Sequence, residues 1–416
     1  MTVHEQIEQL CLQTKSAVDS IATAGTKKKN EILQAIARML IARTEDILEA
    51  NSLDVEAARE AGLSEAMIDR LSLNQSRIEG ICRAIDELIG LPDPIGTGEC
   101  WTRPSGLEIK RVRVPLGVVG IIYEARPNVT VDAATMCIKS GNAVILRGGK
   151  EAIRTNVALV NAMKEALAEC LVNPDVVSLV ENTDRESATE LMGMRDYIDV
   201  LIPRGGKGLI RSVIENAKVP VIETGAGNCH LFVDDSADMD MAVDVAINAK
   251  CSRPSVCNAV ETMLVHAGIA AEFLPRFAEA AKAYDLQIRG CAKTNILLPD
   301  SIEATEEDYD TEFHDYILAV KVVPDINDAI NHIHKYSTGH SEAILTRSLT
   351  NAERFQREIH SAAVYVNAST RFTDGGEFGF GAEIGISTQK LHARGPMGLT
   401  ALTTEQYRIT GDGTVR

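Results

Sequence analysis

The sequence predicts an α/β protein built on parallel sheets and divided into more than one domain. Short, nearly continuous apolar runs alternate with helical segments from Leu116 onward, which is typical of parallel strands covered on both faces. The length of 416 residues exceeds the usual size of one domain. A helical region, residues 5–90, precedes the first apolar run.

Apolar residues recur at helical spacing through this N-terminal region. The clearest sets are Ile32, Leu33, Ile36, Leu40, Ile47 and Leu48, and then Ile78, Ile81, Cys82, Ile85 and Leu88. Spacings of three and four residues predict amphipathic helices. Ser76 and Glu79 form a capping-box pattern that predicts the start of the second set. Prolines and glycines end the helical region at residues 92–98, and residues 107–114 suit an exposed or pairing strand.

The next part of the chain predicts strands whose carboxyl ends carry distinctive residues. The apolar runs end at Ile122, Leu146, Val180, Ile202 and Ile222, and helices are expected at 151–170 and 208–217. Ligands of parallel sheets bind beyond the carboxyl ends of the strands. Four of these ends carry Gly, Arg, Lys or Asn, within 124–128, 147–150, 203–207 and 223–228. Turn chemistry explains the glycines but not the recurring arginines, so we expect an anionic ligand there.

A second α/β segment contains a candidate nucleophile. Strands are predicted at 261–265, 318–323, 343–346 and 362–366. Cys257 lies in a loop of small residues between an expected helix, 239–249, and the first of these strands. A thiol in such a loop can approach a substrate, although the same composition also surrounds inert cysteines. The tail, 401–416, is either a frayed terminus or a strand lent to a partner subunit.

Composition excludes several classes of function. The net charge of −17 argues against nucleic acid and anionic membrane surfaces as partners. The polar start predicts no signal peptide, and the longest apolar run, 114–123, is too short to span a bilayer. Nine cysteines without a CxxC pair suggest a reducing compartment, so we expect a cytoplasmic protein. No metal-ligand spacing is present in the sequence, and no metal is expected.

Several long motifs occur in a characteristic order. They are residues 114–120 running into 123–128, then 140–149, 221–225, 253–259 and 387–399. Together they resemble the aldehyde dehydrogenase superfamily, and within it the γ-glutamyl phosphate reductase family, over nearly the whole chain. The resemblance implies a Rossmann-like NADP-binding domain (1–99 and 119–225), an α/β catalytic domain (226–399) and a β oligomerisation arm (100–118 and 400–416).

The resemblance implies NADPH-dependent reductive dephosphorylation of L-glutamyl 5-phosphate to L-glutamate 5-semialdehyde, in proline biosynthesis from glutamate. Cys257 would attack the acyl phosphate as a thiolate and carry a thioester. Asn128 and the Cys257 backbone N–H would stabilise the oxyanion, although Asn128 also reads as a helix N-cap. Glu223 matches the glutamate with which hydrolytic members activate water. Its role here is therefore open between proton donor, cofactor positioning and no direct part.

The resemblance also implies the binding residues. The cofactor set is Arg147, Gly148, Lys150, Arg204, Gly205, Gly206 and Glu312. The guanidinium of Arg147 would suit a 2′-phosphate and so favours NADPH, whereas Glu312 can also be one solvated charge in an acidic segment. The substrate set is Arg126, Arg253, Asn367 and Arg394. Each of these arginines can instead form a structural ion pair.

The expected partners follow from the same resemblance and from what the chain lacks. A homo-oligomer is implied by the arm. No amino-acid kinase segment is present in the sequence, so a separate glutamate 5-kinase would supply the labile acyl phosphate, and direct handover between the two enzymes is a hypothesis.

Two other functions compete with this one. One is a hydrolytic NAD(P)-dependent aldehyde dehydrogenase, which Glu223 permits and the motifs around Arg126 and Arg394 oppose. The other is a non-catalytic binding protein, which the combination of Cys257, Asn128 and Glu223 opposes. Phosphate dependence of turnover would separate the first alternative from the reductase, and the activity of a Cys257→Ala variant would test the second.

Overall fold

The computed structural model describes residues 1–124 and 126–416. Their contacts divide the chain into two compact units, and each is described by itself. Unit 1 comprises Met1–Glu223, Phe380–Gly385 and Met397–Arg416; unit 2 comprises Thr224–Gly379 and Ile386–Pro396. The main division falls two residues before the predicted start of the catalytic domain. Two short C-terminal segments that were predicted for that domain, Phe380–Gly385 and 397–399, belong to unit 1.

The N-terminal region of unit 1 is helical, as predicted. Its helices are α1 (Val3–Ala17), α2 (Asp19–Ala22), α3 (Thr26–Ala42), α4 (Thr44–Glu60), α5 (Glu65–Leu71) and α6 (Gln75–Gly90). The capping box predicted at Ser76 is wrong, because the N-cap of α6 is Asn74. Asn74 immediately precedes Gln75, the first residue of the helix. Its side chain accepts a hydrogen bond from the Arg77 backbone N–H at 2.8 Å, which satisfies one of the free donors of the first turn.

The central sheet of unit 1 has four parallel strands in the order β5-β4-β3-β6. They are β3 (Val118–Tyr123), β4 (Ala143–Arg147), β5 (Val177–Leu179) and β6 (Val200–Arg204). Four of the five predicted strands are thereby confirmed. The fifth, ending at Ile222, is wrong, because only a single bridge joins Leu201 to Val221. Pro220 precedes that bridge and has no N–H to extend a ladder.

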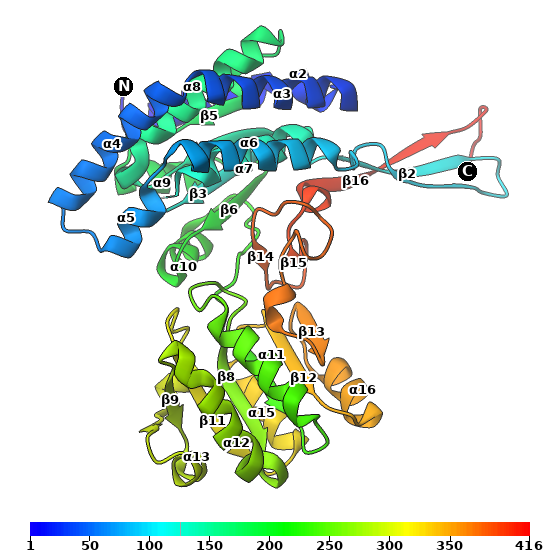
Figure 1. Ribbon diagram of the computed structural model, residues 1–416. Coiled ribbons are helices and arrows are strands. Elements are labelled where there is room, and N and C mark those ends of the chain that lie inside the picture. The colour runs from blue at the N-terminus through cyan, green and yellow to red at the C-terminus, as the bar shows by residue number, and fades with distance from the viewer. Residues whose placement is uncertain (125) are drawn as a thin grey trace. The chain divides into compact units, whose positions relative to one another are not determined.

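Helices hold the strand ends of this sheet in place. They are α7 (Pro127–Lys139), α8 (Ile153–Glu169), α9 (Arg185–Gly193) and α10 (Lys207–Asn216), with short 3-10 turns at Lys150–Ala152 and Pro174–Val176. Ile7 and Cys11 of α1 pack into one apolar cluster with Ile145 of β4 and Val213 of α10. Helix α7 starts directly after the β3 end, and α10 directly after the β6 end (Figure 1).

A separate antiparallel sheet of unit 1 has the order β1-β2-β16, from β1 (Gly98–Thr102), β2 (Glu108–Pro115) and β16 (Thr403–Thr410). The strand predicted at 107–114 is confirmed as β2. Residues 403–410 of the tail are not frayed, because β16 pairs with β2 along its whole length; a contact of this strand with a partner subunit stays a prediction. In Figure 1 β2 and β16 project together from the helices of unit 1. β16 is an edge strand, and Tyr407 and Ile409 on it are exposed.

Unit 2 is built on a seven-stranded parallel sheet of order β10-β9-β11-β8-β7-β12-β13. Its strands are β7 (Cys229–Val233), β8 (Val260–His266), β9 (Gln287–Gly290), β10 (Ile302–Glu303), β11 (Ile317–Val323), β12 (Ser341–Leu345) and β13 (Ala363–Val366). The four predicted strands are confirmed as β8, β11, β12 and β13. β7, β9 and β10 were not predicted, and β9 and β10 are short, with a polar residue at one end.

The helices of unit 2 alternate with its strands (Figure 1). They are α11 (Met239–Cys251), α12 (Ala267–Ala281), α13 (Ala292–Leu297), α14 (Glu306–Tyr309), α15 (Ile326–Tyr336) and α16 (Leu349–Glu358). The 3-10 turns are Lys282–Tyr284, Thr370–Phe372 and, in unit 1, Leu399–Leu402; β14 (Ile386–Ser387) and β15 (Gly395–Pro396) form a small antiparallel pair. Within the described ranges, none of the helices combines the length and apolarity that crossing a membrane requires.

Candidate functional site

Cys257 lies in the loop between α11 and β8, as predicted, and it is half-buried. Gly227 lies just before β7, Glu312 before β11 and His340 before β12. All four residues therefore precede strands of one parallel sheet, at its amino edge. The candidate nucleophile of unit 2 uses the edge opposite to the one that ligands of parallel sheets usually occupy.

Gly227 fixes the backbone of the nucleophile loop by close contact. A Cβ atom at this position would lie 1.6 Å from the carbonyl oxygen of Cys257 and 2.6 Å from its Cα. The Gly227 N–H donates to Glu312 Oε1 at 2.9 Å. Only a residue without a side chain allows the two backbones to approach this closely.

Glu312 is a positioning residue for this loop. Its second carboxylate oxygen lies 3.3 Å from His314 Nε2, and its side chain is 16% exposed. Burial raises the pKa of Glu312, but the hydrogen bonds and charge of His314 and the Gly227 N–H outweigh it, so the net pKa is below the usual range. Glu312 is therefore a specific acceptor in unit 2, and the alternative of one solvated charge among many is wrong.

A buried thiol also contacts the nucleophile loop. Cys229, the first residue of β7, donates its S–H to the Cys257 carbonyl at 3.2 Å, and its sulfur lies 3.6 Å from His340 Nδ1. Burial raises the pKa of Cys229 well above its usual value, so the thiol stays protonated and remains a donor. Burial lowers the pKa of His340 to about 4, so this ring is neutral near pH 7. The carbonyl of Cys257 thus accepts from a neutral thiol, which itself lies beside a neutral ring.

Arg371, which was not predicted as a site residue, also contacts the loop that carries Cys257. It lies in the 3-10 turn after β13, and its Nε donates to Ser252 Oγ at 3.1 Å. Its Nη1 donates to Asn258 Oδ1. The exposed side chain of Arg253 belongs to the loop between these two contacts. Arg253 and Arg371 therefore place two guanidinium groups at the nucleophile loop.

Asn128 of unit 1 is the second residue of α7 and is exposed. The N-cap of that helix is Arg126, so the alternative assignment of Asn128 as N-cap is wrong. The Asn128 amide donates to Asp132 Oδ2 at 3.2 Å, one helical turn on. Burial raises the pKa of Asp132 to about 6. The amide is thus oriented by a carboxyl group whose charge changes just below neutral pH.

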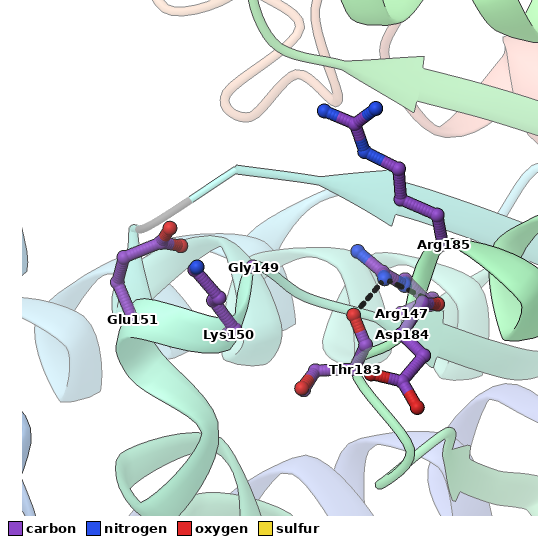
Figure 2. A pocket seen from close by; sticks show the side chains of 7 residues that line it. All are labelled: Arg147, Gly149, Lys150, Glu151, Thr183, Asp184 and Arg185. Atoms are coloured by element: carbon purple, nitrogen blue, oxygen red, sulfur yellow. Dashed lines mark hydrogen bonds between the residues drawn. The ribbon is translucent and has the colours of Figure 1, made fainter.

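A cavity of about 390 Å³ lies beyond the carboxyl end of β4. Figure 2 shows the residues that line it: Arg147, Gly149, Lys150, Glu151, Thr183, Asp184 and Arg185. Arg147 Nη2 donates to the carbonyls of Thr183 and Asp184, at 2.6 and 3.1 Å. Burial lowers the pKa of Arg147. Arg147, which was predicted to bind a cofactor phosphate, therefore links the backbone of residues 183–184 to the end of β4.

Lys150 and Arg185 are the other two cations of this cavity. Both are exposed, and among the described residues neither side chain has a hydrogen bond or salt bridge. Arg185 was not predicted. Gly148, which was predicted, does not line the cavity; a Cβ there would lie 2.3 Å from Asn156 Nδ2, so the packing leaves no room for a side chain at this position.

The loop after β6 presents a helix N-terminus that already holds a carboxylate. Gly206 is the N-cap of α10, and its N–H donates to Glu124 Oε1 at 3.0 Å. A Cβ on Gly205 would lie 2.6 Å from the Glu124 carboxyl carbon. Burial raises the pKa of Asp132, and the charge of Arg204, half-buried at the end of β6, offsets part of that rise. Helix N-termini bind anions, so a cofactor pyrophosphate at this position has to displace Glu124.

The remaining predicted residues are Glu223, Arg126, Arg394 and Asn367. Glu223 is half-buried at the last position of the first segment of unit 1, and Arg126 is exposed beside Ala125, which lies outside the described residues. Arg394 is exposed and donates to the carbonyl of His360. Asn367 has φ 53°, and its amide exchanges hydrogen bonds of 2.8 and 2.9 Å with the backbone of Thr346. These hydrogen bonds hold the Asn367 side chain at the end of β12, and the substrate role predicted for it stays a prediction.

The chain matches known proteins over its whole length. The sequence model of the aldehyde dehydrogenase family matches residues 2–294. The chain is 55% identical to a gamma-glutamyl phosphate reductase of Heliobacterium modesticaldum over 417 aligned residues, covering 100% of both chains.

This chain belongs to the aldehyde dehydrogenase family, in its gamma-glutamyl phosphate reductase branch.

Other comparisons agree with this placement in the family. A gamma-glutamyl phosphate reductase of Carboxydothermus hydrogenoformans is 56% identical over 413 residues, covering 99% of this chain and 100% of the relative. The crystal structure of the Thermotoga maritima gamma-glutamyl phosphate reductase has a TM-score of 0.97 at 52% identity, covering 99% of both chains. An acetylating aldehyde dehydrogenase of Geobacillus thermoglucosidasius, at 15% identity and TM-score 0.70, shares the fold. The predicted aldehyde dehydrogenase-like fold is confirmed.

Proposed function

We propose that this family member catalyses the NADPH-dependent reductive dephosphorylation of L-glutamyl 5-phosphate to L-glutamate 5-semialdehyde and phosphate, the reductase step of proline biosynthesis. The observation that carries the proposal is the Cys257 loop, whose backbone is fixed by Gly227 and Cys229. These contacts hold the loop in one conformation, as a nucleophile that must meet an acyl carbon requires. The full-length identity to reductases of this name supports the choice of substrate.

The cavity beside β4 supports a phosphate-bearing nucleotide as cofactor. Three cations, Arg147, Lys150 and Arg185, line it together with two carboxylates, Glu151 and Asp184. The exposed Lys150 and Arg185 fit the 2′-phosphate that distinguishes NADPH from NADH, while Arg147 holds the loop that carries Arg185. When bound, the nicotinamide supplies the hydride that reduces the thioester.

The protein's own groups carry the rest of the proposed mechanism. The Cys257 thiolate attacks the acyl carbon, and the C–O bond to phosphate breaks, which leaves a thioester and inorganic phosphate. Asn128 stabilises the oxyanion of each tetrahedral species, together with the Cys257 backbone N–H. After reduction, the thiohemiacetal collapses to the aldehyde and the free thiolate. Glu223 acts as a proton donor, positions the cofactor or takes no direct part, and Arg126, Arg253 and Arg394 are candidates for binding the substrate anions.

The partners belong to the same proposal. The β1-β2-β16 arm supports a homo-oligomer, because β16 leaves an unpaired edge in the sheet and carries exposed Tyr407 and Ile409. The labile acyl phosphate has to come from a glutamate 5-kinase, and a biosynthetic enzyme of this type is expected in the cytoplasm.

The test is the phosphate dependence of the reverse reaction. The purified protein is incubated with glutamate 5-semialdehyde and NADP, and NADPH formation is followed at increasing phosphate. The proposal predicts turnover that requires phosphate and saturates with it. Steady formation of glutamate without phosphate would instead establish the hydrolytic aldehyde dehydrogenase, the alternative that Glu223 permits.

A further inference from the structure

Arg371 forms hydrogen bonds with residues at both ends of the loop that carries Cys257. Its Nε donates to Ser252 Oγ at 3.1 Å, and its Nη1 donates to Asn258 Oδ1. Arg253 directly follows Ser252 in the chain, and Cys257 directly precedes Asn258. The guanidinium of Arg371 therefore spans the segment that carries the reacting thiol.

The backbone around this guanidinium is fixed by further hydrogen bonds. Asn258 Nδ2 donates to the carbonyls of Arg371 and Thr373, at 3.2 and 3.0 Å. The Thr370 hydroxyl donates to the Asn258 carbonyl at 2.6 Å, and both of these side chains are buried. The position of Arg371 relative to the Cys257 loop is thus set by a network and not by one flexible contact.

The two guanidiniums have no matching carboxylate. In the part of the chain that the structure describes, neither Arg253 nor Arg371 forms a salt bridge, and Arg371 Nη2 has no hydrogen bond. Asp374 acts on Arg371 only through its charge, while its Oδ1 accepts the Gly376 N–H at 2.8 Å. Burial, and then the charge of Arg253, lower the pKa of Arg371.

This excess of positive charge is local. The chain carries 59 acidic against 42 basic side chains, so carboxylates are abundant, yet none pairs with these two arginines among the described residues. Like charges held together in a partly buried loop repel each other. An anion bound between them would remove that repulsion.

We propose that Arg371 and Arg253 form the anion site that binds the substrate beside Cys257, through either the phosphoryl group or the α-carboxylate of glutamyl phosphate. The inference rests on the proposed function and adds Arg371 as a binding residue. The planar fork of a guanidinium matches both oxyanions, and the free Nη2 remains available as a donor.

The experiment compares Arg371→Gln, Arg371→Lys and Arg253→Gln with the wild-type protein. The matched control is Arg357→Gln, an arginine of unit 2 on α16 whose side chain is 75% exposed. Phosphate and glutamate semialdehyde are varied separately in the reverse reaction. Loss of a charged hydrogen-bond partner predicts a rise of about 10-fold to 100-fold in the KM of the anion concerned. Arg371→Lys should fall between wild type and Arg371→Gln, and the control should match the wild type.

A second measurement does not need turnover. Inorganic phosphate and L-glutamate are tested as protectants of Cys257 against iodoacetamide, with melting temperatures to confirm folding. The inference predicts that one of these anions protects the wild type and that Arg371→Gln weakens this protection about 10-fold or more. A rise in the phosphate KM assigns the site to the phosphoryl group, and a rise in the semialdehyde KM assigns it to the carboxylate.

A purely structural Arg371 would give a different pattern. Arg371→Gln would then lower kcat and alter the alkylation rate of Cys257, with both KM values and the anion protection unchanged. That result would overturn the inference while leaving the proposed reaction intact. Absence of phosphate-dependent turnover in the wild type would instead reject the proposed function, and the protection assay would still decide whether an anion binds here.

Discussion

Gly227→Ala tests whether a glycine sets the position of the nucleophile. The added Cβ would start 1.6 Å from the Cys257 carbonyl oxygen, whereas real Cβ contacts are essentially never under 3.0 Å. The two backbones therefore have to separate by about 1.4 Å. A misplacement of about 1 Å can cost on the order of 100-fold in rate. We expect kcat to fall by at least about 100-fold, or roughly 3 kcal/mol in activation free energy.

The assay is phosphate-dependent NADPH formation, combined with the rate at which iodoacetamide alkylates Cys257. Gly193→Ala is the control, because a Cβ added there meets no heavy atom within 4 Å and the φ of Gly193 is not positive. The control should retain wild-type kcat. A Gly227→Ala protein that is folded, with wild-type kcat and alkylation rate, would refute the reasoning, because the loop would then tolerate a shift that the contacts forbid.

Three further predictions concern unit 1. Asn128→Ala should lower kcat about 100-fold to 1000-fold with little change in cofactor KM, as loss of one oxyanion donor does; a fall of less than about threefold in steady-state kcat would remove Asn128 from the mechanism. Lys150→Gln and Arg185→Gln should each raise the KM for NADPH about tenfold but leave that for NADH unchanged, and equal effects on both cofactors would contradict the cavity assignment. Burial raises the folded pKa of Asp132 to about 6 from 3.8, so its contribution to stability is greatest below pH 3.8 and is lost as the pH rises toward 6. Asp132→Asn should therefore remove a fall in melting temperature between pH 4 and 6, and identical pH profiles of the two proteins would show that the carboxyl group is not perturbed.

The sequence predicted the parts of the fold that depend on local pattern. Continuous apolar runs located β3 and β4, because strands buried on both faces have little choice of composition. Mostly apolar runs, interrupted by Glu261 and Lys321, located β8 and β11. The pattern failed near Ile222, where Pro220 interrupts pairing. It also missed β9, because Gln287 and Arg289 break the apolar run.

The candidate site was predictable where one residue type carries the chemistry. Cys257 stood out as a thiol in a loop of small residues, and the motifs brought forward Asn128 and Glu223. Gly227 lies within the stretch 223–228, where an anionic ligand was expected. Its contact with Cys257 could not be predicted by spacing, because the two residues are 30 positions apart. Arg371 could not be found by spacing, because its partners lie 113 and 119 residues away. The Arg147 side chain was expected to face a ligand, but its Nη2 donates to the carbonyls of Thr183 and Asp184.

The central claim, a thioester on Cys257 that phosphate and not water resolves, is tested most directly by a single-turnover experiment without phosphate. Mixing the enzyme with glutamate semialdehyde and NADP should produce a burst of one NADPH per active site, followed by a stop, and mass spectrometry should place a glutamyl adduct on Cys257. Added phosphate should release the adduct and restart turnover, and Cys257→Ala should show no burst. Continuous NADPH formation without phosphate, or a burst that survives Cys257→Ala, would contradict the account.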